Sequence, residues 1–308
     1  MIQLYRGRLA PSPTGYLHLG HARTFWVAYR RARATAGNLI FRNEDLDQQR
    51  SRPEFVHAMY EDLRWLGLDW DEGPDIPPQS GKGGQPGDPD IGGMFGPYSQ
   101  SERRSFYLEA WRKLRDGGFI YPCTCSRKDL ERALSAPHEE DDDEIRYPGN
   151  CRSRLAEARN WQAPAGVSWR FKVPDHKLVS FVDGYHGGQH FTAGRDFSDF
   201  LVWRRDDVPA YQLAVVVDDE AMQITEVVRG ADLLRSTARQ LLLIEALDYA
   251  KPAYFHCPLL RDERNQRLAK RHDALSLRRL REQGLDPREL WQRFAEEVAW
   301  DRNLPPPT

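Results

Sequence analysis

Hydrophobic and polar residues at the start of the chain follow a strand, helix, strand order. A strand is predicted over Gln3 to Ala10, bounded by Pro11, and a second one over Leu39 to Arg42. Between them, from about Gly20 to Gly37, apolar residues recur at helical spacing and arginines take the opposite side. This order and spacing predict a βαβ unit and hence a parallel sheet.

The rest of the chain shows the same two periods in shorter stretches. Further helices are predicted to start at Pro53, at the capping-box sequence Ser99-x-x-Glu102, at Ser236 and at Asp286-Pro287-x-Glu289. Short strands are predicted over Val167–Val173, Leu178–Val182, Phe200–Trp203, Leu213–Val217 and Gln223–Val228. The run from Leu213 does not alternate, which is typical of a strand buried on both faces. The stretch Gly73 to Tyr98 is rich in Gly and Pro and predicts a long loop.

Composition indicates a soluble globular protein. The 308 residues are about two domains' worth, with 40% hydrophobic and 29% charged residues. No apolar run approaches the roughly 20 residues that span a membrane, and the chain start lacks the apolar segment of a signal peptide. Four cysteines are too few for a disulfide framework, so we expect a cytoplasmic location and no membrane partner. The net charge of -2 argues against general polyanion binding but permits a local basic face.

The most informative stretch is the turn after the first strand, residues 11–15, with His18-Leu19-Gly20-His21 behind it. In open parallel sheets, ligands bind beyond the carboxyl ends of strands. Gly20 permits close approach, and the free N–H groups of a helix start attract anions, so both histidines can point at one phosphate. Neither a G-x-G-x-x-G nor a P-loop motif is present, which disfavours dinucleotide cofactors and P-loop hydrolysis. Taken alone, the two histidines could simply cap a helix.

A second candidate site combines Cys123-x-Cys125 with Tyr147-x-x-x-Cys151. Zinc usually takes four Cys and His ligands, so this spacing alone is a weak signal, and three buried cysteines are the plain alternative. His138 lies between the two pairs and could supply the fourth ligand. The acidic run 139–144, which also separates the pairs, is read as a solvated loop.

Several motifs together resemble the class I aminoacyl-tRNA synthetases of the glutamyl type. They are Arg8-Leu-Ala-Pro-Ser-Pro-Thr-Gly, His18-Leu-Gly-His21, Phe41-Arg-Asn-Glu44-Asp45-Leu-Asp47, Tyr211-Gln-Leu-Ala-Val-Val-Val-Asp-Asp and Val228-Arg229-Gly230-Ala-Asp232. Leu19 stands where the family's HIGH signature has Ile. The motifs follow one another in the family's order and extend over nearly the whole chain, so the set is far more specific than any one motif.

The resemblance implies an α/β fold with four segments. Residues 1–118 and 195–260 would form the two halves of a Rossmann-type, HIGH-type catalytic domain with a parallel sheet. Residues 119–194 would be an inserted, smaller α+β subdomain that binds zinc. Residues 261–308 would carry a KMSKS-like loop and a short helical segment, with no anticodon-binding domain.

The resemblance also implies roles in activating glutamate with ATP. His18 and His21 would stabilise charge on the α-phosphate, and Gly20 would lie against ATP. Lys270, within Arg267-Leu-Ala-Lys-Arg-His272, would hold the ATP phosphates, with Mg²⁺ as the companion ion. Arg267 replaces the first lysine of KMSKS and Ala269 its serine, so one hydrogen bond is in doubt while the charge is kept.

Five residues would hold the amino acid. Arg8, in the family's glutamate-binding segment together with Ser12, would pair with the substrate side-chain carboxylate, which a guanidinium binds bidentately. Arg229 would act as its partner, Glu44 would hold the ammonium group, and Tyr211 would close the pocket. Taken alone, each has a plain alternative as a surface charge, a turn residue or core.

One branch of this family, the glutamyl-Q tRNA(Asp) synthetases, matches further in length and motif variants. Its zinc site implies Cys123, Cys125, Tyr147 and Cys151 as ligands of one structural zinc ion, with Tyr147 favoured over His138. Members activate L-glutamate without tRNA and transfer it to queuosine in the anticodon loop of tRNA(Asp). We therefore expect this activity, from a monomer. The alternatives are a short glutamyl-tRNA synthetase that charges an acceptor end, and a non-catalytic RNA- or nucleotide-binding relic.

Overall fold

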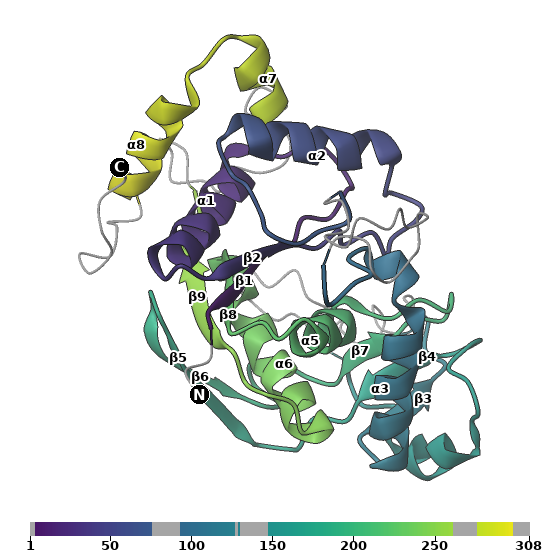
Figure 1. Cartoon of the computed structure of the whole chain (residues 1–308). Coiled ribbons are helices and arrows are strands. Elements are labelled where there is room, and N and C mark those ends of the chain that lie inside the picture. The colour runs from purple at the N-terminus through teal and green to yellow at the C-terminus, as the bar shows by residue number, and fades with distance from the viewer. Residues whose placement is uncertain (1–3, 76–92, 127–128, 130–146, 261–275, 298–308) are drawn as a thin grey trace.

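The first strands and helix form the expected βαβ unit. The computed structural model describes residues 4–75, 93–126, 129, 147–260 and 276–297. Strands β1 (Arg6–Leu9) and β2 (Asn38–Phe41) pair in parallel, and α1 (Leu19–Ala34) connects them (Figure 1). The apolar face of α1 is buried, as its helical spacing predicts. The loop between β1 and α1 therefore leaves the sheet at its carboxyl edge.

A second sheet continues this arrangement with four strands in the order β6-β5-β9-β8. Strands β8 (Glu226–Gly230) and β9 (Ala253–Cys257) are parallel, and β5 (Leu178–Asp183) and β6 (Gly187–Thr192) form an antiparallel hairpin beside β9. The amide of Thr225 donates to the carbonyl of Arg6 at 2.9 Å, so β8 runs beside β1. The carboxyl ends of β1 and β8 consequently face the same cleft, and the sheets are mixed rather than purely parallel.

A third sheet is antiparallel and consists of β3 (Ile120–Cys123), β4 (Ser168–Phe171) and β7 (Phe200–Trp203). The 3-10 segment η2 (Arg152–Asn160) packs against β3. Pairing crosses the expected boundary at residue 194, because β7 pairs with β4 while β5 pairs with β9. The four segments expected from the sequence stay a prediction, and the sheets establish a mixed α/β fold.

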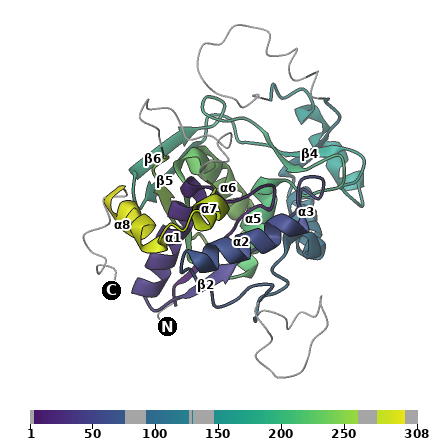
Figure 2. The same ribbon diagram turned by 90° about the horizontal axis from the view of Figure 1, so that it is seen from above.

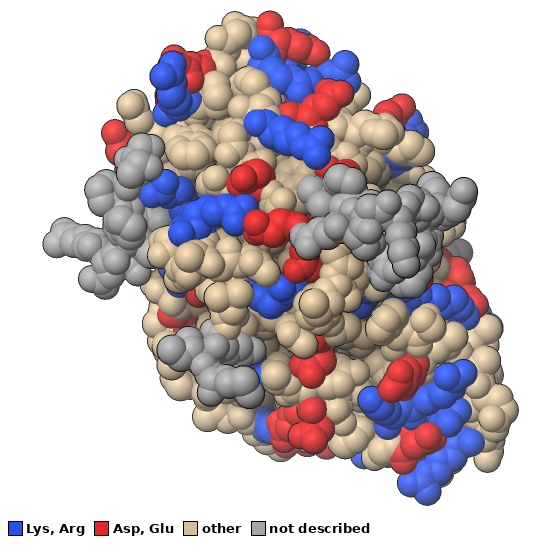
Figure 3. Space-filling view, in the orientation of Figure 1, with Lys and Arg blue, Asp and Glu red and all other residues tan. Residues whose placement is uncertain are grey.

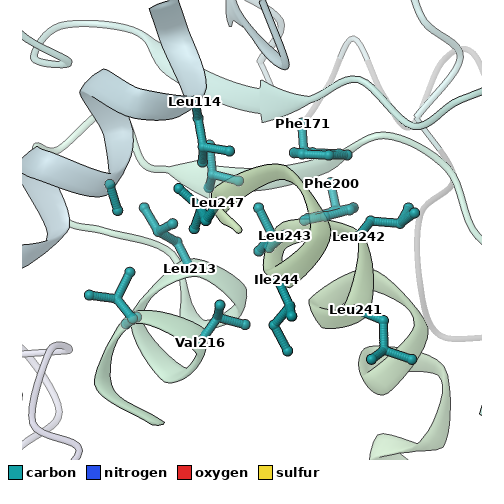
Figure 4. Close-up of a cluster of buried hydrophobic side chains, with 14 of the residues drawn as sticks. Leu114, Phe171, Phe200, Leu213, Val216, Leu241, Leu242, Leu243, Ile244 and Leu247 are labelled. Carbon is teal, nitrogen blue, oxygen red and sulfur yellow. The ribbon is translucent and has the colours of Figure 1, made fainter. Parts of the chain in front are cut away.

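The run Leu213–Val217, predicted as a strand, is instead part of helix α5 (Tyr211–Ala221), so that prediction was wrong. Helices α3 (Arg104–Asp116) and α6 (Leu234–Leu247) and strand β7 pack around α5. Figure 4 shows Leu213 and Val216 of α5 among the leucines of α6, with Phe171 and Phe200 close by. Because nearly every side of α5 is buried, its apolar residues show no helical period.

The remaining helices cover one end of the molecule. Helices α2 (Pro53–Trp65), α7 (Leu277–Glu282) and α8 (Pro287–Glu297) lie near α1 in both ribbon views (Figures 1 and 2). The predicted helices from Pro53 and Asp286 are confirmed, and the one from Ser236 begins two residues earlier, with α6. Among the described helices, none has the length and apolar character needed to cross a membrane.

The predicted capping box at Ser99 was wrong. Ser99 precedes the 3-10 turn η1 (Gln100–Glu102) and makes no side-chain cap bond to it; its hydroxyl accepts a bond from the side chain of Asn43 at 3.3 Å. The α-helix itself begins at Arg104. The hydroxyl therefore ties the segment after β2 to η1 instead of capping a helix. Only residues 73–75 and 93–98 of the predicted long loop are described.

Candidate active site

One cleft of about 950 Å³ lies beyond the carboxyl ends of β1 and β8. Its walls come from the loop after β1, the start of α1, the segment after β2, the start of α5, the end of β8 and the segment after β9. It brings together every described residue that the sequence predicts for glutamate or ATP: Arg8, Ser12, His18, Gly20, His21, Glu44, Tyr211 and Arg229. Lys270 and its motif lie outside the described residues.

The two histidines begin helix α1 and lie ring to ring. His18 is the N-cap, and its Nδ1 accepts the amide hydrogen of Gly20 at 3.1 Å. A Cβ on Gly20 would come within 3.0 Å of the His18 ring, so glycine is needed for this close approach. Since Nδ1 is an acceptor, a neutral His18 carries its proton on Nε2 and can donate it into the cleft. The His21 ring stacks on His18 with centroids 3.8 Å apart. Helix capping and ligand binding are thus compatible roles.

The inner wall of the cleft is a buried network of charges. Arg42, which directly follows β2, donates to Asp219 at 2.7 Å and to Glu44 at 3.0 Å. The Nε atom of Arg8 lies 3.4 Å from the same Asp219. Arg8 also donates to the carbonyl of Val228 at 2.8 Å. Burial lowers the pKa of Arg8, and Asp219 opposes that change. Burial likewise raises the pKa of Glu44, and the Arg42 guanidinium opposes it.

Arg229 approaches the same cleft from the carboxyl end of β8 and is buried. Its Nε faces His256 at 3.1 Å, and its Nη2 donates to the hydroxyl of Thr237 at 2.7 Å. Its Nη1 lies 3.5 Å from the hydroxyl of Tyr211, a half-exposed ring in the cleft wall. The guanidinium groups of Arg8 and Arg229 therefore line the cleft, and that of Arg42 is buried behind them. The carboxylates of Asp219 and Glu44 both act on Arg8.

Sequence reasoning missed the residues that organise this wall. Arg42 and Asp219 lie inside motifs that carry the resemblance, but their local sequence predicts no role for either. Asp219 follows the apolar run of α5 together with Asp218, which accepts from Arg103 at 2.6 Å. A pair of acids at the end of a fully buried run is a signal for buried ion pairs, because carboxylates are rarely buried without partners.

Three cysteine sulfurs gather at the end of β3. The Sγ atoms of Cys123, Cys125 and Cys151 all lie within 4.8 Å of one another, with 3.6 Å between Cys125 and Cys151. The hydroxyl oxygen of Tyr147 lies 3.5 Å from Cys123 Sγ and 3.8 Å from Cys125 Sγ. The predicted cysteine and tyrosine set is therefore brought together, while His138 lies outside the described residues. No disulfide links the described cysteines.

These separations fit one tetrahedral zinc ion. Zn–S bonds of about 2.3 Å and Zn–O bonds of about 2.0 Å at the tetrahedral angle place two sulfurs about 3.8 Å apart and a sulfur and an oxygen about 3.5 Å apart. The guanidinium of Arg170 stands over the ring of Tyr147, 4.0 Å from its centroid. Burial and the neighbouring thiols raise the pKa of Tyr147, so the bound ion itself would have to stabilise the phenolate. The donor set thus fits the group that the sequence predicts.

The fold and the cleft belong to a known class of synthetases. The chain belongs to the family of class I tRNA synthetases (E and Q), catalytic domain, whose model matches residues 5–302. This membership confirms the prediction of an aminoacyl-tRNA synthetase-like ligase. Its match over nearly the whole chain also confirms the resemblance to the class I synthetases.

Two similar curated proteins are glutamyl-Q tRNA(Asp) synthetases. That of Symbiobacterium thermophilum is 46% identical over 283 residues, which cover 91% of this chain and 82% of the relative. That of Nitratidesulfovibrio vulgaris is also 46% identical, over 92% of this chain and 82% of the relative. These similarities confirm the predicted resemblance to that branch.

Longer relatives share the same domain. The glutamate–tRNA ligase 2 of Acidithiobacillus ferrooxidans is 43% identical over 91% of this chain, which spans 55% of that protein. The solved glutamate–tRNA synthetase of Elizabethkingia anophelis superposes with a TM-score of 0.70 at 29% identity, over 87% of this chain and 53% of that one. The chain thus spans about half the length of these two proteins.

Proposed function

We propose that the protein activates L-glutamate with ATP, without needing tRNA, and then transfers the glutamyl group to queuosine in the anticodon loop of tRNA(Asp). The observation that carries the first step is the charge of the inner wall. Of the charged residues that line the cleft, Arg8, Arg23 and Arg229 are basic, and Glu44 and Asp232 are acidic. The pocket therefore carries a net positive charge that a glutamate zwitterion, with its net single negative charge, complements.

Each end of glutamate has a partner in this pocket. Arg8 and Arg229 bind its side-chain carboxylate, Glu44 binds its ammonium group, and Ser12 and Tyr211 complete the walls. Glutamine would lack one negative charge, which would leave a buried guanidinium without an anion, and the wrong substrate is rejected on that ground.

The histidines serve the phosphate side of the same cleft. An oxygen of the glutamate α-carboxylate attacks the α-phosphorus of ATP, the bond to the β-phosphate oxygen breaks, and glutamyl-adenylate and pyrophosphate result. His18 donates from Nε2 to the α-phosphate, with His21 stacked beside it and Gly20 under the nucleotide. Lys270 would neutralise the departing pyrophosphate, and a Mg²⁺ ion bound with ATP would share that charge; this part of the proposal rests on the sequence alone.

In the RNA step, a hydroxyl of queuosine attacks the carbonyl carbon of glutamyl-adenylate and loses its proton, the bond to the phosphate oxygen breaks, and AMP leaves. The RNA reaches the adenylate through the mouth of the cleft. Tyr16 lines it with a half-exposed ring, and the guanidinium of Arg278 stands over that ring, 5.2 Å from its centroid. A ring beside a cation suits the bases and phosphates of a single-stranded anticodon loop. On the face drawn in Figure 3, basic and acidic side chains are interspersed, so RNA contacts are local rather than spread over one basic surface.

The cysteine cluster supports a structural role for one zinc ion. Cys123, Cys125, Cys151 and Tyr147 would hold it, and a site with four protein ligands is closed to substrate. When bound, the ion would supply no chemistry to the cleft. It would fix the end of β3 against the segment that carries Tyr147 and Cys151.

A second candidate is the charging of a tRNA acceptor end, and the similarity to the glutamate–tRNA ligase of Acidithiobacillus ferrooxidans favours it. Glutamate-dependent exchange of labelled pyrophosphate into ATP without tRNA tests the first step, and its absence would favour a non-catalytic relic. Transfer of labelled glutamate is then compared between tRNA(Asp) with and without queuosine. Equal transfer to both would overturn the queuosine proposal in favour of acceptor-end charging.

A further inference from the structure

Arg229 is a buried cation that contacts no carboxylate in the described part of the chain. Its residue is 5% exposed, and no described Asp or Glu oxygen lies within 4.0 Å of its guanidinium. Other buried arginines nearby are paired directly: Arg42 with Asp219 at 2.7 Å and Arg103 with Asp218 at 2.6 Å. A buried charge without a partner is costly, so the groups around Arg229 need a physical account.

Two neutral groups hold the guanidinium from behind. Nε donates to His256 Nε2 at 3.1 Å, and Nη2 donates to Thr237 Oγ1 at 2.7 Å. His256 lies on the neighbouring strand β9, in register with Arg229, and Thr237 lies in the first turn of α6. The remaining Nη1 faces Tyr211 and the cleft. The contacts of Nε and Nη2 thus fix the plane of the guanidinium, and its Nη1 edge faces the cleft, where a carboxylate could bind.

The tautomer of His256 follows from this contact. An arginine can only donate, so His256 Nε2 must accept, and the proton of the neutral ring lies on Nδ1. Nδ1 lies 2.6 Å from a carboxylate oxygen of Asp183, which accepts that proton's hydrogen bond. Asp183 also accepts the amides of Tyr185 at 3.0 Å, His186 at 2.9 Å and His256 at 3.1 Å. Burial lowers the pKa of His256 although Asp183 opposes it, in keeping with a neutral ring.

We propose that Asp183 and His256 are positioning residues that orient Arg229 toward a glutamate carboxylate while leaving its charge unneutralised. The inference rests on the proposed function, because it assumes that Arg229 binds glutamate. A carboxylate in direct contact with Arg229 would satisfy the cation internally and weaken its attraction for substrate. The neutral imidazole instead separates the guanidinium from its countercharge. Asp183 and His256 are fully buried and neither lines the cleft, so neither can touch the substrate.

Kinetics of pyrophosphate exchange test the orientation. Misplacement of a binding group by about 1 Å can cost on the order of 100-fold, so His256→Leu should raise the KM for glutamate by about 10- to 100-fold and leave the KM for ATP unchanged. His256→Gln, whose amide oxygen can accept from Arg229, should recover most of that loss. His190→Leu, an exposed histidine on β6, is the matched control and should match the unmutated protein.

Three outcomes would overturn the inference. The first is a His256→Leu variant with an unchanged KM for glutamate. The second is a His256→Leu variant whose KM for ATP rises as much as its KM for glutamate. The third is a loss that His256→Gln fails to rescue. The last two results would indicate only a disturbed fold. Asp183→Asn should reproduce the selective effect, since an amide can donate to Nδ1 and so favour the tautomer whose Nε2–H faces Arg229.

A spectroscopic measurement separates this inference from the proposed function. Long-range ¹H–¹⁵N spectra of the labelled full chain report the tautomer of each histidine, and His256→Gln assigns the signal. We expect the Nδ1–H form. An Nε2–H or doubly protonated ring would overturn the proposed positioning of Arg229 by Asp183 and His256, whatever the enzyme's activity. If instead the unmutated protein shows no glutamate-dependent exchange while His256 has the expected tautomer, the proposed function fails and the positioning of Arg229 stands.

Discussion

Neutralising Glu44 should separate substrate binding from stability. In Glu44→Gln, the amide oxygen can still accept from Arg42, which also keeps its 2.7 Å bond to Asp219. The substrate ammonium group, however, loses a charged partner. A hydrogen bond to a charged group contributes about 1.5–3 kcal/mol, so we expect the KM for glutamate to rise by about 10- to 150-fold. The measurement is glutamate-dependent pyrophosphate exchange with glutamate varied at saturating ATP.

Glu44→Gln should weaken glutamate binding but should not lower the free energy of unfolding. Burial raises the pKa of Glu44 above its ordinary value, so the folded protein holds this proton more tightly than the unfolded chain does. The stability that this bound proton contributes to the folded protein is present at low pH and is lost as pH rises through the pKa of Glu44 in the folded state. Glutamine never ionises, so the variant should be at least as stable as the unmutated protein near pH 8. Its relative gain should vanish in acid, which urea unfolding at several pH values can measure.

A matched control strengthens the comparison. Glu72 is buried and accepts from Arg6 at 2.9 and 3.2 Å, but it does not line the cleft. Glu72→Gln should therefore destabilise the fold without a selective rise in the KM for glutamate. A Glu44→Gln variant that keeps the original KM for glutamate would rule out Glu44 as the ammonium partner. A loss of stability as large as that of Glu72→Gln would show that Glu44 is needed for the fold.

Three further predictions concern other parts of the molecule. His18→Asn keeps an oxygen that can cap Gly20 but removes the ring donor, so exchange should fall by about 10²- to 10³-fold at an unchanged melting temperature; retained exchange would contradict the phosphate role. Cys125→Ser should lose bound zinc and melt at a lower temperature, and elemental analysis that finds no zinc in the unmutated protein would dispose of this idea. Burial raises the pKa of Asp62 from 3.8 to about 6, although Arg281 lies 3.4 Å away. Asp62→Asn should therefore raise the free energy of unfolding by up to about 3 kcal/mol at pH 8 and leave it unchanged below about pH 4. Urea unfolding at both pH values measures this, and a gain that does not depend on pH would count against it.

Local sequence patterns were sufficient where one face of an element meets solvent. The βαβ start, α2 and α8 were all predicted, because each of these helices carries a polar face that reveals its period. The start of α5 shows the limit. A helix enclosed by α3, α6 and β7 needs no polar face, so its sequence could not be told from that of a buried strand.

The residues of the cleft also differ in how far the sequence predicts them. The residues of contiguous motifs, His18 to His21 above all, could be predicted because their chemistry lies within one turn of chain. The charges behind them could not, since Arg42 meets Asp219 across 177 residues and Asp183 meets His256 across 73. The sequence by itself determined the family and the groups that line the cleft. Only the tertiary structure decided which buried partners orient those groups, because such partners are defined by strand pairing and burial and leave no local pattern.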